Sequence, residues 1–189
     1  MTPGAWTGFR QTLKLQMESL VYGNDINGFA RAFTLAYDTA IKQGGDTINQ
    51  IPLLVGNTAA MESVLTASLL EIQFSKNLTL LDVIGRSVIV YWAGQSLLQG
   101  IPPIIPAVGA TVNITNVQSV VLNPGTSADW TVLPVLPSNA SDQFLNSFIT
   151  SAKIHLQTIS GIFIVTASYP PFGQPAPGVV NWSGYTVLD

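Results

Sequence analysis

The order of apolar and polar positions along the chain divides it into a helical first half and a mixed second half. In four segments of the first half, apolar residues recur three or four positions apart, which is the spacing of one face of a helix. Those segments cover residues 7–21, 26–42, 58–76 and 80–98. The pattern therefore predicts four helices before Gly100.

Polar residues and glycines at the segment boundaries support these helices. Asp25 or Asn24 can accept a hydrogen bond from the first turn of the second helix, and Asn57 or Thr58 can do the same for the third. Thr79 and Asp82 have the spacing of a capping box before the fourth. That fourth segment is apolar on most faces, which is typical of a helix buried all round.

The second half favours strands with one further helix. Proline-rich residues 101–107 predict a stiff extended loop, because each proline fixes its own φ and biases its predecessor. Alternating residues 110–122 predict one or two strands, and residues 130–136 another. A helix capped by Ser141 is predicted over 142–158, followed by strands over 162–167 and 179–187. The prolines in 169–178 predict a loop.

This succession predicts an α+β fold in one compact unit over residues 1–189. The unit comprises a helical half, 1–99, and a neutral, proline-rich β or mixed half, 100–189. No internal repeat divides it further.

Charge is scarce and unevenly distributed. Charged residues make up 9% of the chain, against about 25% in a typical soluble domain, while hydrophobic residues make up 47%. Residues 100–189 contain Asp129, Asp142, Asp189 and Lys153 as their only charged side chains besides the single histidine. A surface with so little charge predicts contact with a partner, and so an oligomer or a larger assembly. The alternative is a β surface that is simply neutral.

Several functional classes do not fit this composition. The net charge is −3 and no Lys/Arg cluster is present, which argues against nucleic acid. Without cysteine there is no disulfide, thiolate zinc site or cysteine nucleophile. The ten carboxylates are scattered, so no metal or cofactor site is predicted. Residues 1–10 lack the pattern of a secretory signal, and prolines interrupt the longest uncharged run, so we expect an intracellular protein without a membrane span.

His155 is the only candidate catalytic residue that the sequence suggests. Near the end of the last predicted helix, it could pair with Ser151 or lie near Ser160, as a hydrolase would require. No G-x-S-x-G elbow surrounds any serine, however. The alternative is a histidine that bonds backbone near a helix C-terminus. We predict that the protein is not an enzyme.

Aromatic residues supply a further candidate site. Trp182 and Tyr185, within the segment 181–185, could stack on a sugar in a carbohydrate-binding module. Aromatic residues in a neutral segment also anchor protein interfaces. We predict an interface, with docking loops 101–107 and 169–178, formed by Pro102, Pro103, Pro106, Trp130, Tyr169, Phe172, Trp182 and Tyr185.

Four stretches carry a resemblance to a known class of protein. They are GGDTIN (44–49) with VGNT (55–58), IPPIIPAVG (101–109) leading into NIT (113–115), HLQTISG (155–161) and PAPGVVNWSGY (175–185). Together they resemble small structural proteins of large tailless or tailed double-stranded DNA viruses. The resemblance implies a minor capsid or cementing protein of the virion that contacts copies of itself and the major shell protein. It assigns no functional residue.

Overall fold

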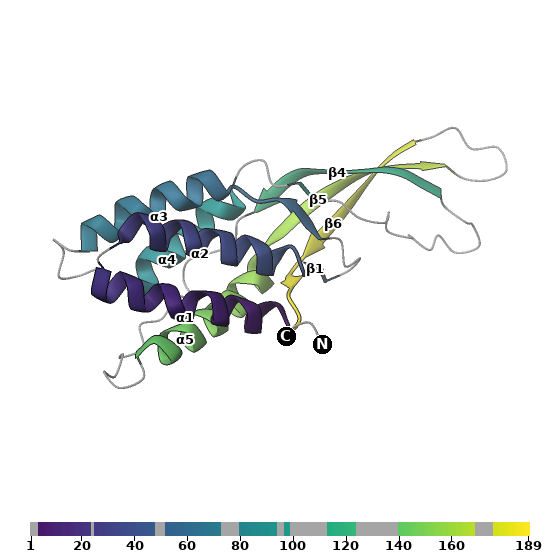
Figure 1. Ribbon diagram of the computed structural model, residues 1–189. Helices are drawn as coiled ribbons and strands as arrows, with labels where there is room; N and C mark the ends of the chain where they lie inside the picture. The colour runs from purple at the N-terminus through teal and green to yellow at the C-terminus, as the bar shows by residue number, and fades with distance from the viewer. Residues whose placement is uncertain are drawn as a thin grey trace.

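The computed structural model describes residues 4–23, 25–47, 52–72, 80–93, 97–98, 113–123, 140–168 and 176–189. It shows a mixed α+β fold in which helices predominate, as the sequence predicts. The helices form one body, and a three-stranded antiparallel sheet extends from it like an arm (Figure 1). The start of α1 lies beside the C-terminal residues at the edge of the helical body (Figure 1).

Among the described residues, five helices make up the body. They are α1 (Ala5–Gly23), α2 (Ile26–Ile41), α3 (Thr58–Ile72), α4 (Leu80–Trp92) and α5 (Ala140–Thr158). The short connection between α1 and α2 makes them antiparallel neighbours, and α5 lies beside α1 (Figure 1). All four helices predicted in the first half, and the one predicted in the second, are therefore present.

The predicted caps of α2 and α3 are confirmed. The Asp25 carboxylate accepts a hydrogen bond from the Gly28 amide at 2.8 Å. The Asn57 side chain accepts one from the Ala60 amide at 3.4 Å. Each bond satisfies an amide that has no carbonyl partner inside the first turn.

In the part of the chain that the structure describes, seven strands form three small antiparallel sheets. Strand β1 (Gly45–Asp46) pairs with β7 (Tyr185–Thr186), and β2 (Leu53–Val55) pairs with β3 (Leu97–Leu98). The arm contains β4 (Asn113–Asn123), β5 (Ser160–Ser168) and β6 (Ala176–Ser183), in that order across the sheet. β4 has one-residue register shifts at Thr115 and Val120, whereas β5 and β6 pair without interruption.

Three predicted boundaries are wrong. Helix α4 ends at Trp92, and Leu97–Leu98 instead pair with β2, because a backbone partner is available there. Helix α5 begins at Ala140, which places Ser141 inside the first turn and not at the cap. The strand predicted over 179–187 is interrupted at Gly184, whose φ of 80° is incompatible with a continuous strand.

One predicted loop is partly a strand, and three other predicted elements lie outside the described residues. Ala176–Gly178 belong to β6 and not to a loop, which Pro177 tolerates because β6 is at the sheet edge. The strand predicted over 130–136, the loop over 101–107 and the end of the third helix beyond Ile72 lie outside the described residues.

One hydrophobic core joins both halves of the chain. It contains side chains from all five helices and, from the last residues, Tyr185 and Val187. At its centre, the rings of Phe9 and Phe148 stack with their centroids 5.1 Å apart, and Phe33 meets Phe148 edge-on at 5.0 Å. The C-terminal segment is thus part of the core of the helical body.

Candidate functional site

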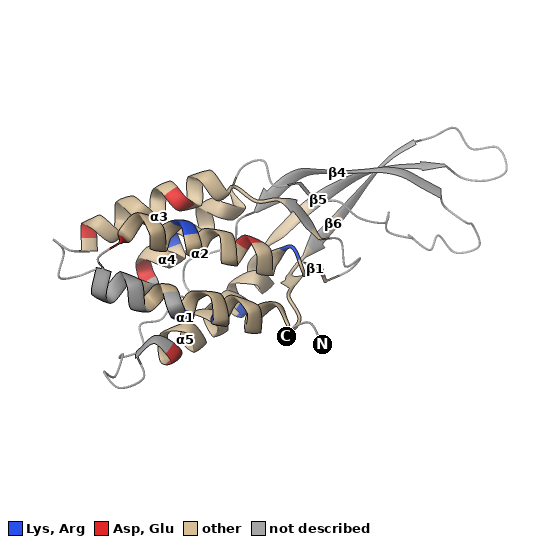
Figure 2. Ribbon diagram, in the orientation of Figure 1, with Lys and Arg blue, Asp and Glu red and all other residues tan. Residues whose placement is uncertain are grey.

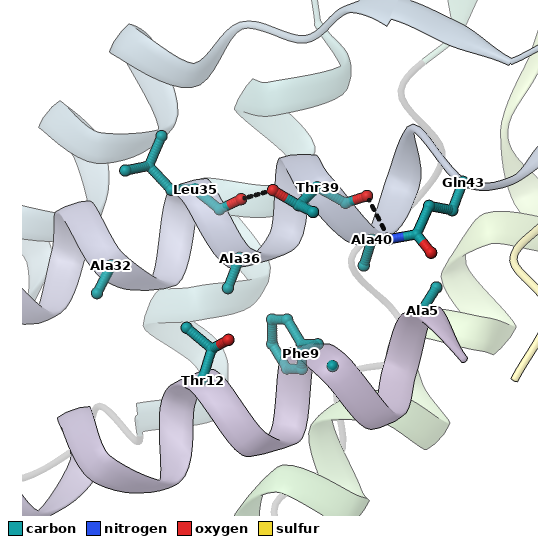
Figure 3. A pocket seen from close by; sticks show the side chains of 10 residues that line it. Ala5, Phe9, Thr12, Ala32, Leu35, Ala36, Thr39, Ala40 and Gln43 are labelled. Atoms are coloured by element: carbon teal, nitrogen blue, oxygen red, sulfur yellow. Dashed lines mark hydrogen bonds between the residues drawn. The ribbon is translucent and has the colours of Figure 1, made fainter. Parts of the chain in front are cut away.

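A groove of about 400 Å³ lies between α1 and α2 on the surface of the helical body (Figure 3). Helix α1 supplies one wall and α2 the other. Its lining consists of Ala5, Gly8, Phe9, Thr12, Ala32, Leu35, Ala36, Thr39, Ala40 and Gln43. None of these residues is charged.

Small side chains keep the groove open. Ala32 and Ala36 on α2 face α1 across the groove, and Phe9 lies between the helices as its floor (Figure 3). A Cβ added at Gly8 would have no heavy atom within 4 Å, so this part of α1 borders empty space. The groove is therefore shallow, uncharged and floored by an aromatic ring that is itself held in the core.

The basic residues of α1, Arg10 and Lys14, contact α5 and do not line the groove. The Arg10 guanidinium donates to the Asn146 side chain, and the Lys14 ammonium lies 3.1 Å from the Asp142 carboxylate. Both contacts join α1 to α5 at exposed positions, where an ion pair contributes up to about 1 kcal/mol. Figure 2 shows other charged residues on α2, α3 and α4.

A buried polar network connects α2 with α4. The Asp38 carboxylate accepts a hydrogen bond from the Tyr91 hydroxyl at 2.8 Å and pairs with the Lys42 ammonium at 2.6 Å. The Trp92 indole donates to the Tyr37 hydroxyl at 3.0 Å. These bonds satisfy polar atoms that would otherwise be costly to bury.

Burial raises the pKa of both tyrosines in this network. Loss of hydration is the main cause for Tyr91, and the neighbouring Asp38 carboxylate raises its pKa further. Loss of hydration is also the main cause of the raised pKa of Tyr37, although its bond with Trp92 acts in the opposite direction. The two hydroxyls remain protonated at neutral pH, so both stay available as hydrogen-bonding groups that join α2 and α4.

His155 is buried completely in α5. Ser151, one turn earlier, is also buried, and the His155 carbonyl accepts a hydrogen bond from the Thr158 hydroxyl at 2.7 Å. His155 does not line the groove. A substrate in solution has no access to this side chain, so the geometry gives no support to the hydrolase alternative.

The structure excludes Tyr185 from the predicted aromatic interface. Its ring is fully buried against Trp92, with ring centroids 5.1 Å apart, and its hydroxyl donates to the Ile41 carbonyl at 2.8 Å. Tyr185 therefore cannot stack on a sugar or a partner, because folding already buries both ring faces. Trp6 and Trp92 are buried in the core as well.

Of the other predicted interface residues, Trp182 alone lies in the described part of the chain. Trp182 belongs to the edge strand β6, where its backbone pairs with Gly161. The remaining six lie outside the described residues; they are Pro102, Pro103, Pro106, Trp130, Tyr169 and Phe172.

Sequence reasoning missed the groove. Its signal is a run of small uncharged residues on the outer faces of two adjacent helices, where long charged side chains are usual. Ala32, Ala36 and Thr39 recur at helical spacing on α2, as do Gly8 and Thr12 on α1. The pairing of these two faces depends on the orientation of both helices, which the period alone does not give.

The described residues contain neither a cluster of metal ligands nor a membrane-spanning helix. No group of three or more His, Cys, Asp and Glu side chains there could hold a metal ion. No helix in the described part of the chain has the length and apolar character needed to cross a membrane. A comparison with protein-family models finds no match, and comparisons with curated proteins and with solved structures find none either.

Proposed function

We propose that this protein is a non-enzymatic structural component of a large assembly, a minor capsid or cementing protein of a virion, which acts through protein–protein contacts. The observation that carries the proposal is the sheet arm: none of the residues in β4, β5 and β6 is charged. The arm extends away from the helical body (Figure 1), and most of the charged residues of the sequence lie in the helices.

The outer edges of the arm, formed by β4 and β6, favour contact with a partner protein. Soluble proteins usually protect edge strands with lysines, prolines or bulges, because unpaired backbone groups recruit other strands. Both outer strands, β4 and β6, lack charge. Only the register shifts in β4 and Pro177 in β6 serve as protection. Such strands are suited to burial against a neighbour.

The viral setting is supported by the resemblance of the four stretches described above and by the scarcity of charge. In this proposal the chain contacts copies of itself and other shell proteins, and it binds neither nucleic acid nor a cofactor.

A gradient experiment tests the proposal. The full chain is expressed together with the products of the genes that neighbour its own, and large particles are separated by sedimentation. The double variant Gln118→Lys, Asn181→Lys places one charge on each outer strand of the arm. We expect the wild-type chain to co-sediment with particles and the variant to remain at the top, because a buried unpaired charge is costly.

Thr150→Lys is the matched control, since it adds a charge at an exposed position of α5. It should co-sediment as the wild type does, and all variants should retain the helical circular dichroism signal. A wild-type chain that never enters a particle, or an arm variant that enters normally, contradicts the proposal.

A further inference from the structure

An asparagine–glycine pair lies in the first turn of α2. Asn27 is followed directly by Gly28, and no other asparagine in the sequence precedes a glycine. In such a pair the glycine amide nitrogen can attack the asparagine side chain, because glycine has no side chain that hinders the approach. Asn27 is exposed, so water reaches it. The pair therefore has the chemistry of a deamidation site, one of the reactions that make asparagine thermolabile.

The reaction joins two neighbouring residues and releases ammonia. The Gly28 nitrogen forms a bond with Cγ of Asn27 while the bond between Cγ and Nδ2 breaks, and the proton of the Gly28 amide leaves with the ammonia. Water then opens the cyclic succinimide and gives aspartate or isoaspartate at position 27. Water is the only co-reactant, and hydroxide accelerates the first step because it removes the amide proton.

The Asp25 cap engages the amide that this reaction needs. The Gly28 amide donates to the Asp25 carboxylate at 2.8 Å. An amide held in this way is harder to deprotonate, because the resulting anion would face a like charge. The Phe29 amide also donates to the Asp25 carbonyl, at 3.0 Å, which holds the first turn closed. Asn27 lies within α2, and its helical ψ differs from the ψ that ring closure requires.

The same cap accounts for the glycine at position 28. A Cβ added to Gly28 would lie 2.1 Å from Oδ2 of Asp25, so any other residue would displace the carboxylate. Glycine is otherwise unfavourable inside a helix. The cap thus requires the labile pair and, in the folded protein, protects it.

We propose that Asn27 is the deamidation site of this protein and that the hydrogen bond from the Gly28 amide to Asp25 controls the rate of the reaction. Deamidation proceeds when the first turn of α2 opens and releases this amide, as local unfolding does at helix ends. The proposal goes beyond the contact function and is independent of it, since it rests on one dipeptide and one cap.

The two products affect α2 differently. Aspartate at position 27 adds a carboxylate to the first turn, where the helix dipole favours negative charge. Isoaspartate adds a methylene to the main chain, which moves the following amides away from their carbonyl partners. Because Phe29 and Phe33 of α2 belong to the core, isoaspartate weakens the attachment of this helix to the body.

Mass spectrometry of the full chain during incubation in warm, mildly alkaline buffer tests the proposal. Deamidation raises the mass of the proteolytic peptide 15–31 by about 1 Da, and fragmentation distinguishes Asn27 from Asn24. We expect the folded wild type to react at least about tenfold more slowly than the chain unfolded in guanidinium chloride. Asp25→Ala should accelerate the reaction of the folded chain by about fivefold, because it removes the cap bond.

Two further variants serve as controls. Asp25→Ser keeps an oxygen that accepts from the Gly28 amide, so its rate should stay below that of Asp25→Ala. Asn57→Ala removes the corresponding cap of α3, where the Asn57 side chain accepts from the Ala60 amide at 3.4 Å. It should leave the rate at Asn27 unchanged, because the two caps share no partner.

Three results overturn the proposal. They are equal rates for the folded and unfolded wild type, no acceleration by Asp25→Ala, and an acceleration by Asn57→Ala or Asp25→Ser as large as that by Asp25→Ala. Circular dichroism checks that each variant is folded. If Asp25→Ala unfolds, hydrogen exchange of the wild type takes its place: the Gly28 amide should exchange more slowly than in the unfolded chain, and an unprotected amide overturns the proposal.

Discussion

Individual buried residues in this protein have precise polar partners. Tyr91 donates to Asp38, Trp92 donates to Tyr37, and Tyr185 donates to the Ile41 carbonyl. Gly56 leaves room for the Tyr91 ring, because a Cβ at this position would lie 2.0 Å from it. These contacts let large polar aromatics fill the core without leaving their hydroxyls unsatisfied.

The raised pKa values of Tyr37 and Tyr91 predict a loss of stability in alkali. Their pKa values in the folded protein are raised above the ordinary value of about 10, so both states are protonated below pH 10 and the groups give no pH dependence there. Above that pH only the unfolded chain releases these protons. The free energy of unfolding should therefore fall by about 1.4 kcal/mol per pH unit for each tyrosine.

Urea titrations between pH 7 and 11, with absorbance at 295 nm, measure this effect. Tyr91→Phe provides the comparison: it should be less stable than the wild type at pH 7, because Asp38 loses a bond, yet its stability should fall less steeply above pH 10. Equal slopes for the two proteins would contradict the prediction.

Strand β6 ends where backbone hydrogen bonds with distant segments override the strand preference of the local sequence. Gly184 separates β6 from β7, and its amide donates to the Ile159 carbonyl at 2.7 Å. Its own carbonyl accepts from the Thr47 amide at 3.1 Å. The turn at Gly184 thus orients β7 so that it pairs with β1, and it places the Tyr185 side chain in the core.

Glycine substitutions should have opposite effects at two positions. Gly184→Ala should lower the free energy of unfolding by about 1–2 kcal/mol, because φ is 80° and the new Cβ would lie 2.9 Å from Thr47. Gly8→Ala should raise it by about 0.5–1 kcal/mol, since Gly8 is helical with open space beside it. Chemical denaturation measures both, and equal signs would contradict this assignment.

At the scale of the whole molecule, the last residues close the fold. The Leu188 carbonyl accepts a hydrogen bond from the Ala5 amide, and the Asp189 carboxylate pairs with Lys153 of α5 at 2.7 Å. Tyr185 and Val187 are buried in the common core. A C-terminal truncation that removes the arm therefore also removes core side chains, and charges placed on the arm test its contacts more cleanly.

Removal of residues 184–189 should destabilise the entire protein. Loss of Tyr185 and Val187 leaves a cavity next to Trp92, and loss of a large buried side chain costs about 3–5 kcal/mol. The melting temperature should fall by about 10 °C or more. Removal of Asp189 alone is the control, and it should cost less than about 1 kcal/mol because its ion pair is exposed. An unchanged melting temperature for the longer deletion would contradict this role.

The sequence by itself determined the five helices, the α+β class and the uneven distribution of charge. Helical period and caps such as Asp25 are local, and local terms act before any long-range contact forms. The strand β3 and the position of Tyr185 could not be predicted in the same way. Leu97 and Leu98 continue a helical apolar pattern, and only the presence of β2 beside them makes a strand.

The tertiary structure alone decided which apolar and aromatic residues are available to a partner. Tyr185 and Trp182 are three positions apart in a sequence segment of one character, yet the turn at Gly184 sends Tyr185 into the core and leaves the backbone of Trp182 in the arm. The groove likewise exists only because α1 and α2 bring Gly8 and Ala36 to the same surface. Exposure is a property of packed neighbours, whereas helical period and charge are properties of the chain.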